Sequence, residues 1–173
     1  MRAYTSEDEE DLIRAEQVVR DRVGELNLDY AALAAISNIF RAANAVRNHM
    51  ERNVLRNEDL SWSSFVVLFV LWVWGEMETA QLADECAVSK GTLSGVLTTL
   101  ERSKLTIRKP HTSDRRRVLV RLTPAGRRLI ARVFPAFNRH ESMVMERLDD
   151  AQARQLAHLL REIMRGTKDA DAS

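Results

Sequence analysis

The sequence predicts a mainly α-helical protein with a small β-wing. Apolar residues recur at helical spacing over most of its 173 residues, and the spacing changes to two only after residue 104. Glycine (6) and proline (3) are scarce, which disfavours a turn-rich all-β fold. A chain of this length holds one domain, or one core with an appended oligomerisation part.

The first third is predicted to form two amphipathic helices. Ser6 and Glu9 have the spacing of a capping box, and the helix that they open is expected to stop at Gly24. A second helix is expected from about Asp29 to Asn53, with its apolar residues on one side.

The next segment is predicted to form a buried helix from Trp62 to Trp74, capped by Ser61 and ended by Gly75, because it is apolar nearly all round. Its longest apolar run is far shorter than the ~18 to 20 residues that span a bilayer. The N-terminus has no basic segment followed by an apolar one, so no secretory signal is indicated. We expect a cytoplasmic protein without a membrane partner.

Two short helices and a β-ribbon are predicted in the middle of the chain. Thr79 is expected to cap the first helix, and Ser89 the second, which runs to about Ser103. Alternating apolar residues then predict two strands around a basic loop at residues 110–116. This order is that of a winged helix-turn-helix.

The C-terminal part is predicted to form two more helices. The pair Thr123-Pro124 opens a long helix that runs to about Leu148. Asp149 caps the last helix, which is expected to end at Gly166. The terminal segments hold more apolar residues than the small motif can cover, so we expect N- and C-terminal dimerisation helices that flank the winged helix-turn-helix.

Charge is unevenly distributed although the net charge is only +1. Residues 1–30 carry nine acids against four arginines, a net charge of −5, whereas residues 100–132 carry eleven bases against two acids, a net charge of +9. A dense basic patch is typical of a polyanion-binding protein, and a solvated charged face is the alternative.

The second short helix is the candidate DNA reader. Its apolar residues follow a core-facing pattern, and its opposite stripe holds two glycines that each cost about 1 kcal/mol in a helix. Glycines there let the backbone approach a major groove closely, and tolerated surface glycines are the alternative. The candidate DNA-binding residues of the two helices are Thr79, Ser89, Lys90, Gly91, Thr92, Ser94, Gly95, Thr98 and Arg102.

The loop of the ribbon is the candidate wing. Arg115, Arg116 and Arg117 suit a narrow, electronegative minor groove, and a solubilising turn is the alternative. Asp114 would be repelled by phosphates, so we expect it to pair with an arginine and to shape the loop.

Residues 60–129 resemble the winged helix-turn-helix of the MarR family of bacterial transcription regulators. The resemblance lies in the helices AQLADECAVSKGTLSGVLTTLERSKL, in the wing SDRRRVLVRL and in the helix start at Thr123 to Gly126. It implies a homodimer, repression of nearby genes, and release from DNA by a small aromatic or phenolic effector. The family commonly has glycine where this chain has Lys104, from which only a local change is expected.

Other kinds of site are weakly indicated. No phosphate-binding loop or catalytic motif is present, and the four histidines are scattered, so we expect no enzyme activity, no metal and no cofactor. Cys86 is expected to be a buried small hydrophobe. Trp62 and Phe65 are more often core residues in such a position, but they are also candidate effector contacts.

The sequence therefore predicts a sequence-specific regulator that binds a palindromic double-stranded operator as a homodimer. We assign residues 1–59 to dimerisation and scaffolding, 60–123 to DNA binding, and 124–173 to dimerisation. The alternative is a winged-helix protein-interaction module whose basic patch binds an acidic partner.

Overall fold

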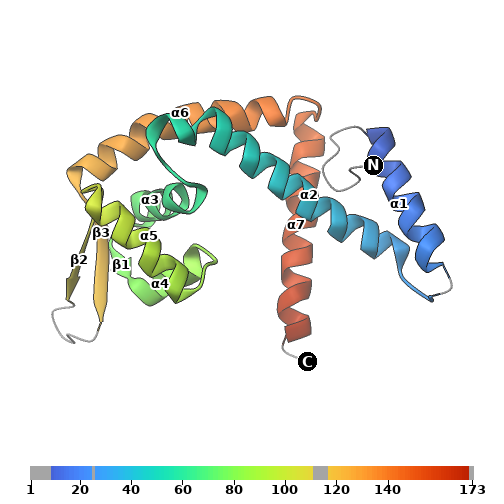
Figure 1. The fold of residues 1–173 in the computed structure, drawn as a ribbon, viewed down its shortest axis with the longest axis horizontal. Helices are drawn as coiled ribbons and strands as arrows, with labels where there is room; N and C mark the ends of the chain where they lie inside the picture. The colour runs from blue at the N-terminus through green and yellow to red at the C-terminus, as the bar shows by residue number, and fades with distance from the viewer. Residues whose placement is uncertain (1–8, 25, 111–116, 172–173) are drawn as a thin grey trace. The chain divides into compact units, whose positions relative to one another are not determined.

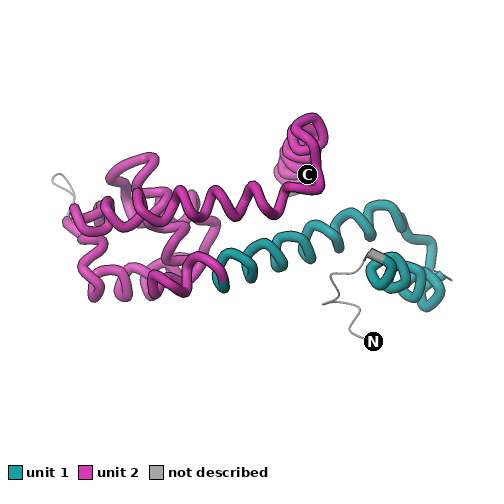
Figure 2. Tube along the Cα trace, turned by 90° about the horizontal axis from the view of Figure 1, so that it is seen from above, with its two compact units in different colours: residues 1–52 teal, residues 53–173 magenta. Residues whose placement is uncertain are grey.

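The computed structural model describes residues 9–24, 26–110 and 117–171, and it confirms the predicted fold class (Figure 1). In chain order the elements are α1 (Glu9–Val23), α2 (Tyr30–Asn53), the 3-10 helix η1 (Leu55–Glu58), α3 (Trp62–Trp74), β1 (Met77–Glu78), α4 (Thr79–Glu85), α5 (Lys90–Arg102), β2 (Thr106–Pro110), β3 (Val118–Leu122), α6 (Pro124–Val144) and α7 (Asp150–Asp171). The chain divides into two compact units, residues 1–52 and 53–173, which Figure 2 colours separately.

The first unit holds α1 and most of α2. The Asp29 carboxylate accepts a hydrogen bond from the Ala32 amide at 2.9 Å, which confirms Asp29 as the start of the second helix. The Asn38 side-chain amide donates to Glu16 at 2.9 Å, and this bond links α2 to α1. Much of the apolar surface stays exposed, including Ile13, Val18, Leu33, Ile36 and Phe40.

The core of the second unit lies where α3 packs on α6. Phe65 stacks on Phe137 with 4.1 Å between ring centroids, and Phe69 lies 5.1 Å from Phe134. Leu68 of α3 and Ile130 of α6 are fully buried. The prediction of a buried third helix is confirmed for most of α3, whereas Val73 and Trp74 in its last turn are 45% and 67% exposed.

The wing is part of a three-stranded antiparallel sheet in the order β1-β3-β2. The strand β1 was not predicted, because two residues are too few to show a periodic pattern. Val120 and Leu122 of β3 are buried, and so is Thr106 of β2, whereas Ile107 is half-buried. Thr106 pairs with Leu122, so the two side chains share the core face of the sheet.

Most helix starts lie where the capping residues predict them. Ser61, Ser89 and Thr123 each accept a hydrogen bond from the amide three residues later, at 3.0 to 3.2 Å. Asp149 and Gln152 cap each other reciprocally.

Three predicted helix boundaries are wrong. Thr79 is the first residue of α4 and not its cap, because Glu78 takes the extended cap position while it pairs with β3. The helix α6 ends at Val144, and the amide of Leu148 bonds to the carbonyl of Met145 in a turn. The helix α7 continues through Gly166 to Asp171, since a lone glycine costs only about 1 kcal/mol in a helix.

The helix α7 is amphipathic and largely uncovered. Leu156, Leu159, Ile163 and Met164 are 37% to 57% exposed along one side. No helix among the described residues is both long enough and apolar enough to cross a membrane.

Candidate nucleic-acid interface

The helix α5 has one buried and one exposed face, as the sequence predicts. Leu93, Leu97 and Leu100 are at most 1% exposed and anchor the helix in the core. The predicted reader residues on the other face are all exposed: Ser89, Lys90, Gly91, Thr92, Ser94, Gly95, Thr98 and Arg102. Thr79, which comes from the first residue of α4, is half-buried. The eight exposed residues are therefore accessible to another molecule.

The two glycines of α5 have no packing role inside the protein. A Cβ atom added to Gly95 would meet nothing within 4 Å, and one added to Gly91 would only make an ordinary contact with the Ser89 hydroxyl. The space above this face is therefore open, which fits close approach of the helix backbone to another molecule.

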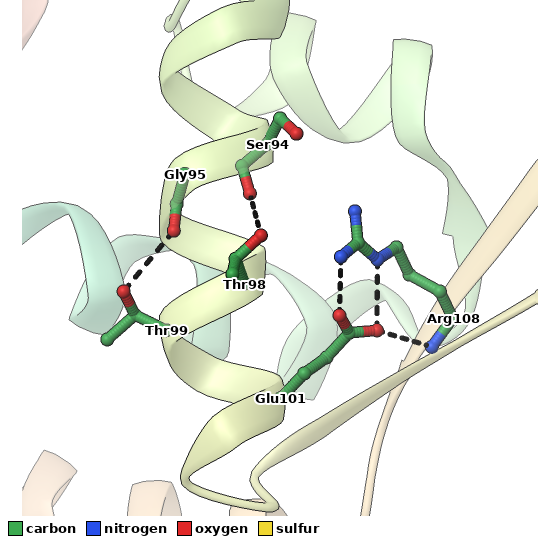
Figure 3. Close-up of polar contacts among 6 residues, drawn as sticks. All are labelled: Ser94, Gly95, Thr98, Thr99, Glu101 and Arg108. Atoms are coloured by element: carbon green, nitrogen blue, oxygen red, sulfur yellow. Dashed lines mark hydrogen bonds and ion pairs between the residues drawn. The ribbon is translucent and has the colours of Figure 1, made fainter.

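Two threonine hydroxyls on α5 are bonded to their own helix (Figure 3). Thr98 donates to the Ser94 carbonyl at 2.9 Å, and Thr99 donates to the Gly95 carbonyl at 3.3 Å. Because the hydroxyl protons are used internally, these side chains present methyl groups and acceptor lone pairs outward. Thr98 is thus suited to a thymine methyl group or to a base amino group.

The predicted tip of the wing lies largely outside the described residues. Asp114, Arg115 and Arg116 belong to that segment, so their roles stay predictions. Arg117 is described, and its guanidinium pairs with both carboxylate oxygens of Glu78, with 2.8 Å between Nε and Oε2. A contact of Arg117 with DNA stays a prediction.

A second ion pair joins the reader helix to the wing (Figure 3). Arg108 of β2 donates from Nε to Oε1 of Glu101 at 2.9 Å and from Nη2 to Oε2 at 2.5 Å. The backbone amide of Arg108 also donates to Oε1 at 3.1 Å. The hydrogen bonds and charge of Arg108 hold the pKa of Glu101 below its ordinary value, so the pair is ionised at neutral pH.

Sequence reasoning missed Glu101, Arg108 and Glu78 as partners. One signal was available, because Glu101 is one of only two acids in the basic stretch from residue 100 to 132. Phosphates would repel the Glu101 carboxylate as they would that of Asp114, so an internal partner is expected for Glu101 as well. The partner itself could not be identified, because it lies seven residues away across a helix-to-strand turn.

The turn that leads into β2 is closely packed against the start of α6. Lys104 adopts a left-handed backbone conformation, with φ of 58°, where the family commonly has glycine. A Cβ atom at Gly126 would lie 2.1 Å from the carbonyl oxygen of Leu105, so only glycine fits there. The Thr123 hydroxyl donates to the Lys104 carbonyl at 2.7 Å and fastens the start of α6 to the same turn.

A groove of about 330 Å³ lies between the helix-turn-helix and the wing. Its floor is apolar and its rim carries two cations, and its lining residues are Thr79, Ala80, Lys90, Leu93, Ser94, Leu97, Arg108 and Val118. The groove shares Thr79, Lys90 and Ser94 with the candidate DNA-binding residues, so it belongs to the same site.

The candidate effector residues lie in the aromatic core of the second unit. Phe65 is 4% exposed beneath Phe137, whereas Trp62 is half-buried, 6.0 Å from the Phe137 ring. A ligand contact at Trp62 and Phe65 stays a prediction.

Metal-ligating side chains are not clustered in the described part of the chain. No group of three or more His, Cys, Asp or Glu side chains is placed there to hold a metal ion. Cys86 is buried, and its burial, followed by the charge of Glu85, raises the pKa of the thiol to about 11. The expectation of a buried small hydrophobe is thereby supported, and the raised pKa disfavours the thiolate form at neutral pH.

Comparisons with known proteins agree with this architecture. Residues 60–118 match the profile described as the MarR family. The HTH-type transcriptional regulator YwaE of Bacillus subtilis is 35% identical over 141 residues, which are 82% of this chain and 81% of that protein.

Two solved structures extend the comparison. BpsR of Bordetella bronchiseptica, reported with 6-hydroxynicotinic acid as a regulator of its DNA binding, is 27% identical, with a TM-score of 0.68 over 73% of this chain and 95% of that one. A variant of MarR from E. coli complexed with operator DNA has the same fold, with a TM-score of 0.70 over 80% of this chain and 99% of that one at 19% identity. The exposed reader helix, the sheet of the wing and the long match to YwaE lead to one conclusion: this chain belongs to the MarR family of transcription regulators.

Proposed function

We propose that this regulator acts as a homodimeric repressor that binds a palindromic double-stranded operator and is released by a small aromatic or phenolic effector. Each subunit places α5 in the major groove and the wing around residues 110–117 in the adjacent minor groove. The observation that carries the proposal is the exposed face of α5, whose two glycines leave open space above the backbone.

The homodimer is supported by apolar surface that stays uncovered in the single chain. Exposed apolar side chains lie on α1 and α2, and a continuous stripe runs along α7. Packing against the same elements of a second copy would bury them with two-fold symmetry. The dimer would present two reader helices to half-sites roughly 10 bp apart, or a small multiple of that distance.

Deletion of residues 149–173 tests the dimer, because nearly all of α7 is exposed and the α3–α6 core does not need it. We expect sedimentation to show a loss of dimer at micromolar concentration and a matching loss of operator affinity. A full-length chain that sediments as a monomer at that concentration would contradict the proposal.

The effector is proposed from the aromatic cluster of α3 and α6. Trp62 is accessible at the edge of this cluster, and BpsR is a relative regulated by an aromatic acid. Titration with 6-hydroxynicotinate is expected to quench tryptophan fluorescence in the wild type and much less in Trp62→Phe. Equal quenching in both proteins would place the ligand elsewhere.

We propose that the protein acts in the cytoplasm by binding alone, without a catalytic step and without a cofactor. Fluorescence anisotropy tests the proposed DNA binding, with a duplex that carries the intergenic region beside the gene for this protein. Neutralisation of phosphates makes the logarithm of the binding constant fall linearly with the logarithm of salt concentration. A chain that binds an acidic polypeptide but no duplex would favour the alternative of a protein-interaction module.

A further inference from the structure

Both strands of the wing are tied to the helix-turn-helix by an arginine–carboxylate pair. Arg108 of β2 binds Glu101 in the last turn of α5. Arg117, directly before β3, binds Glu78, which directly precedes α4. In each pair the β2–β3 hairpin supplies the cation, and the carboxylate comes from α5 or from β1, which directly precedes α4, so the hairpin is held on both sides.

The pair on the reader helix is the more extensive of the two. One carboxylate of Glu101 accepts three hydrogen bonds, two from the guanidinium and one from the backbone amide of Arg108. The hydrogen bond from the backbone amide of Arg108 matters because it fixes the main chain of β2 and not only a long side chain. Glu101 and Arg108 side chains are 28% and 33% exposed, so the contact is partly shielded from solvent.

The sign of the charge on Glu101 argues against a direct role in DNA binding. A carboxylate in a lobe that approaches phosphates weakens attraction, and its removal would tighten binding if charge alone mattered. Glu101 must therefore contribute something that exceeds this cost if it supports binding.

We propose that Glu101 is a positioning residue for DNA recognition: through Arg108 it fixes the base of the wing against the reader helix, so that both enter adjacent grooves as one rigid unit. The proposal rests on the proposed function, because it needs a duplex that α5 and the wing contact together. It adds a residue that itself touches no base or phosphate.

The substitution Glu101→Gln separates positioning from charge, because the two effects have opposite signs. The glutamine side chain keeps the shape of Glu101 but cannot form the charged, two-bond pair with the Arg108 guanidinium. We therefore expect operator affinity to fall about 5- to 10-fold. The matched control is Glu85→Gln, since Glu85 is exposed on α4 and is in no ion pair among the described residues. It removes the same charge, and binding is expected to be unchanged or about 2-fold tighter.

Dimethyl sulfate footprinting on the full-length dimer shows which contact is lost, because the reagent methylates guanine N7 in the major groove and adenine N3 in the minor groove. For Glu101→Gln we expect weaker protection in the minor grooves that the wings enter and retained protection in the major grooves that α5 enters. Arg108→Lys keeps the charge but loses the planar fork, and it should give the same pattern. Thermal unfolding and sedimentation of each variant confirm that the fold and the dimer are intact.

Two results would overturn the positioning role. One is binding by Glu101→Gln that equals or exceeds that of the Glu85→Gln control. The other is loss of protection in both grooves to the same extent, which a general loss of stability would cause. A wild-type chain that protects no site would instead refute the proposed function, and the positioning role with it.

Discussion

Gly95 offers a test that separates fold stability from DNA recognition. A Cβ atom there would meet nothing within 4 Å, so a larger side chain costs no packing inside the protein. Replacing a helical glycine by alanine or leucine gains about 1 kcal/mol per subunit, which corresponds to a rise in Tm of about 2 to 4 °C for a chain of this size. Gly95→Ala and Gly95→Leu should therefore both be at least as stable as the wild type.

The same two variants should differ strongly in DNA binding. The methyl group of alanine adds little bulk, whereas the leucine side chain holds the helix backbone away from the base edges. For Gly95→Leu we expect affinity to fall to the non-specific level, a loss of about 1,000-fold or more. Calorimetry and anisotropy on the same samples measure both quantities. A Gly95→Leu protein that binds its operator normally would refute the assignment of this face, and one that unfolds early would refute the open space above it.

Three further substitutions test separate parts of the account. Arg116→Ala, in the part of the wing outside the described residues, should lose about 1 to 3 kcal/mol of DNA binding while the protein stays a folded dimer; unchanged operator affinity in anisotropy would remove Arg116 from the interface. Gly126→Ala should lower the free energy of unfolding by about 1 to 3 kcal/mol in urea denaturation, because its Cβ would overlap the Leu105 carbonyl, and wild-type stability would contradict this close approach. Thr106→Val should raise Tm, with a gain of about 1 kcal/mol, because the buried Thr106 hydroxyl has no hydrogen-bond partner in the described part of the chain; a fall in Tm would show that the hydroxyl is bonded in solution.

The features that local chemistry determines were predictable from the sequence. A cap such as Ser89 or Thr123 acts within four residues, so the starts of α5 and α6 follow from the sequence alone. The exposed face of α5 follows from helical periodicity and three leucines.

The features that depend on tertiary pairing were not predictable in the same way. The two residues of β1 form a strand only because β3 lies beside them. Thr106 lies in the core although its side chain is polar, because its pairing with Leu122 places both side chains on the core face of the sheet. The pair of Glu101 and Arg108 forms only when β2 folds back along α5, and no spacing rule describes that turn.

Methylation of a bound operator by dimethyl sulfate tests the central claim most directly, because the reagent reads guanine N7 in the major groove and adenine N3 in the minor groove. With α5 as reader and residues 110–117 as wing, we predict two protected major-groove patches related by a two-fold axis, with centres roughly 10 bp apart or a small multiple of that distance. Protected minor-groove adenines should lie beside each patch. A single patch without two-fold symmetry, or protection confined to one groove, would contradict the account.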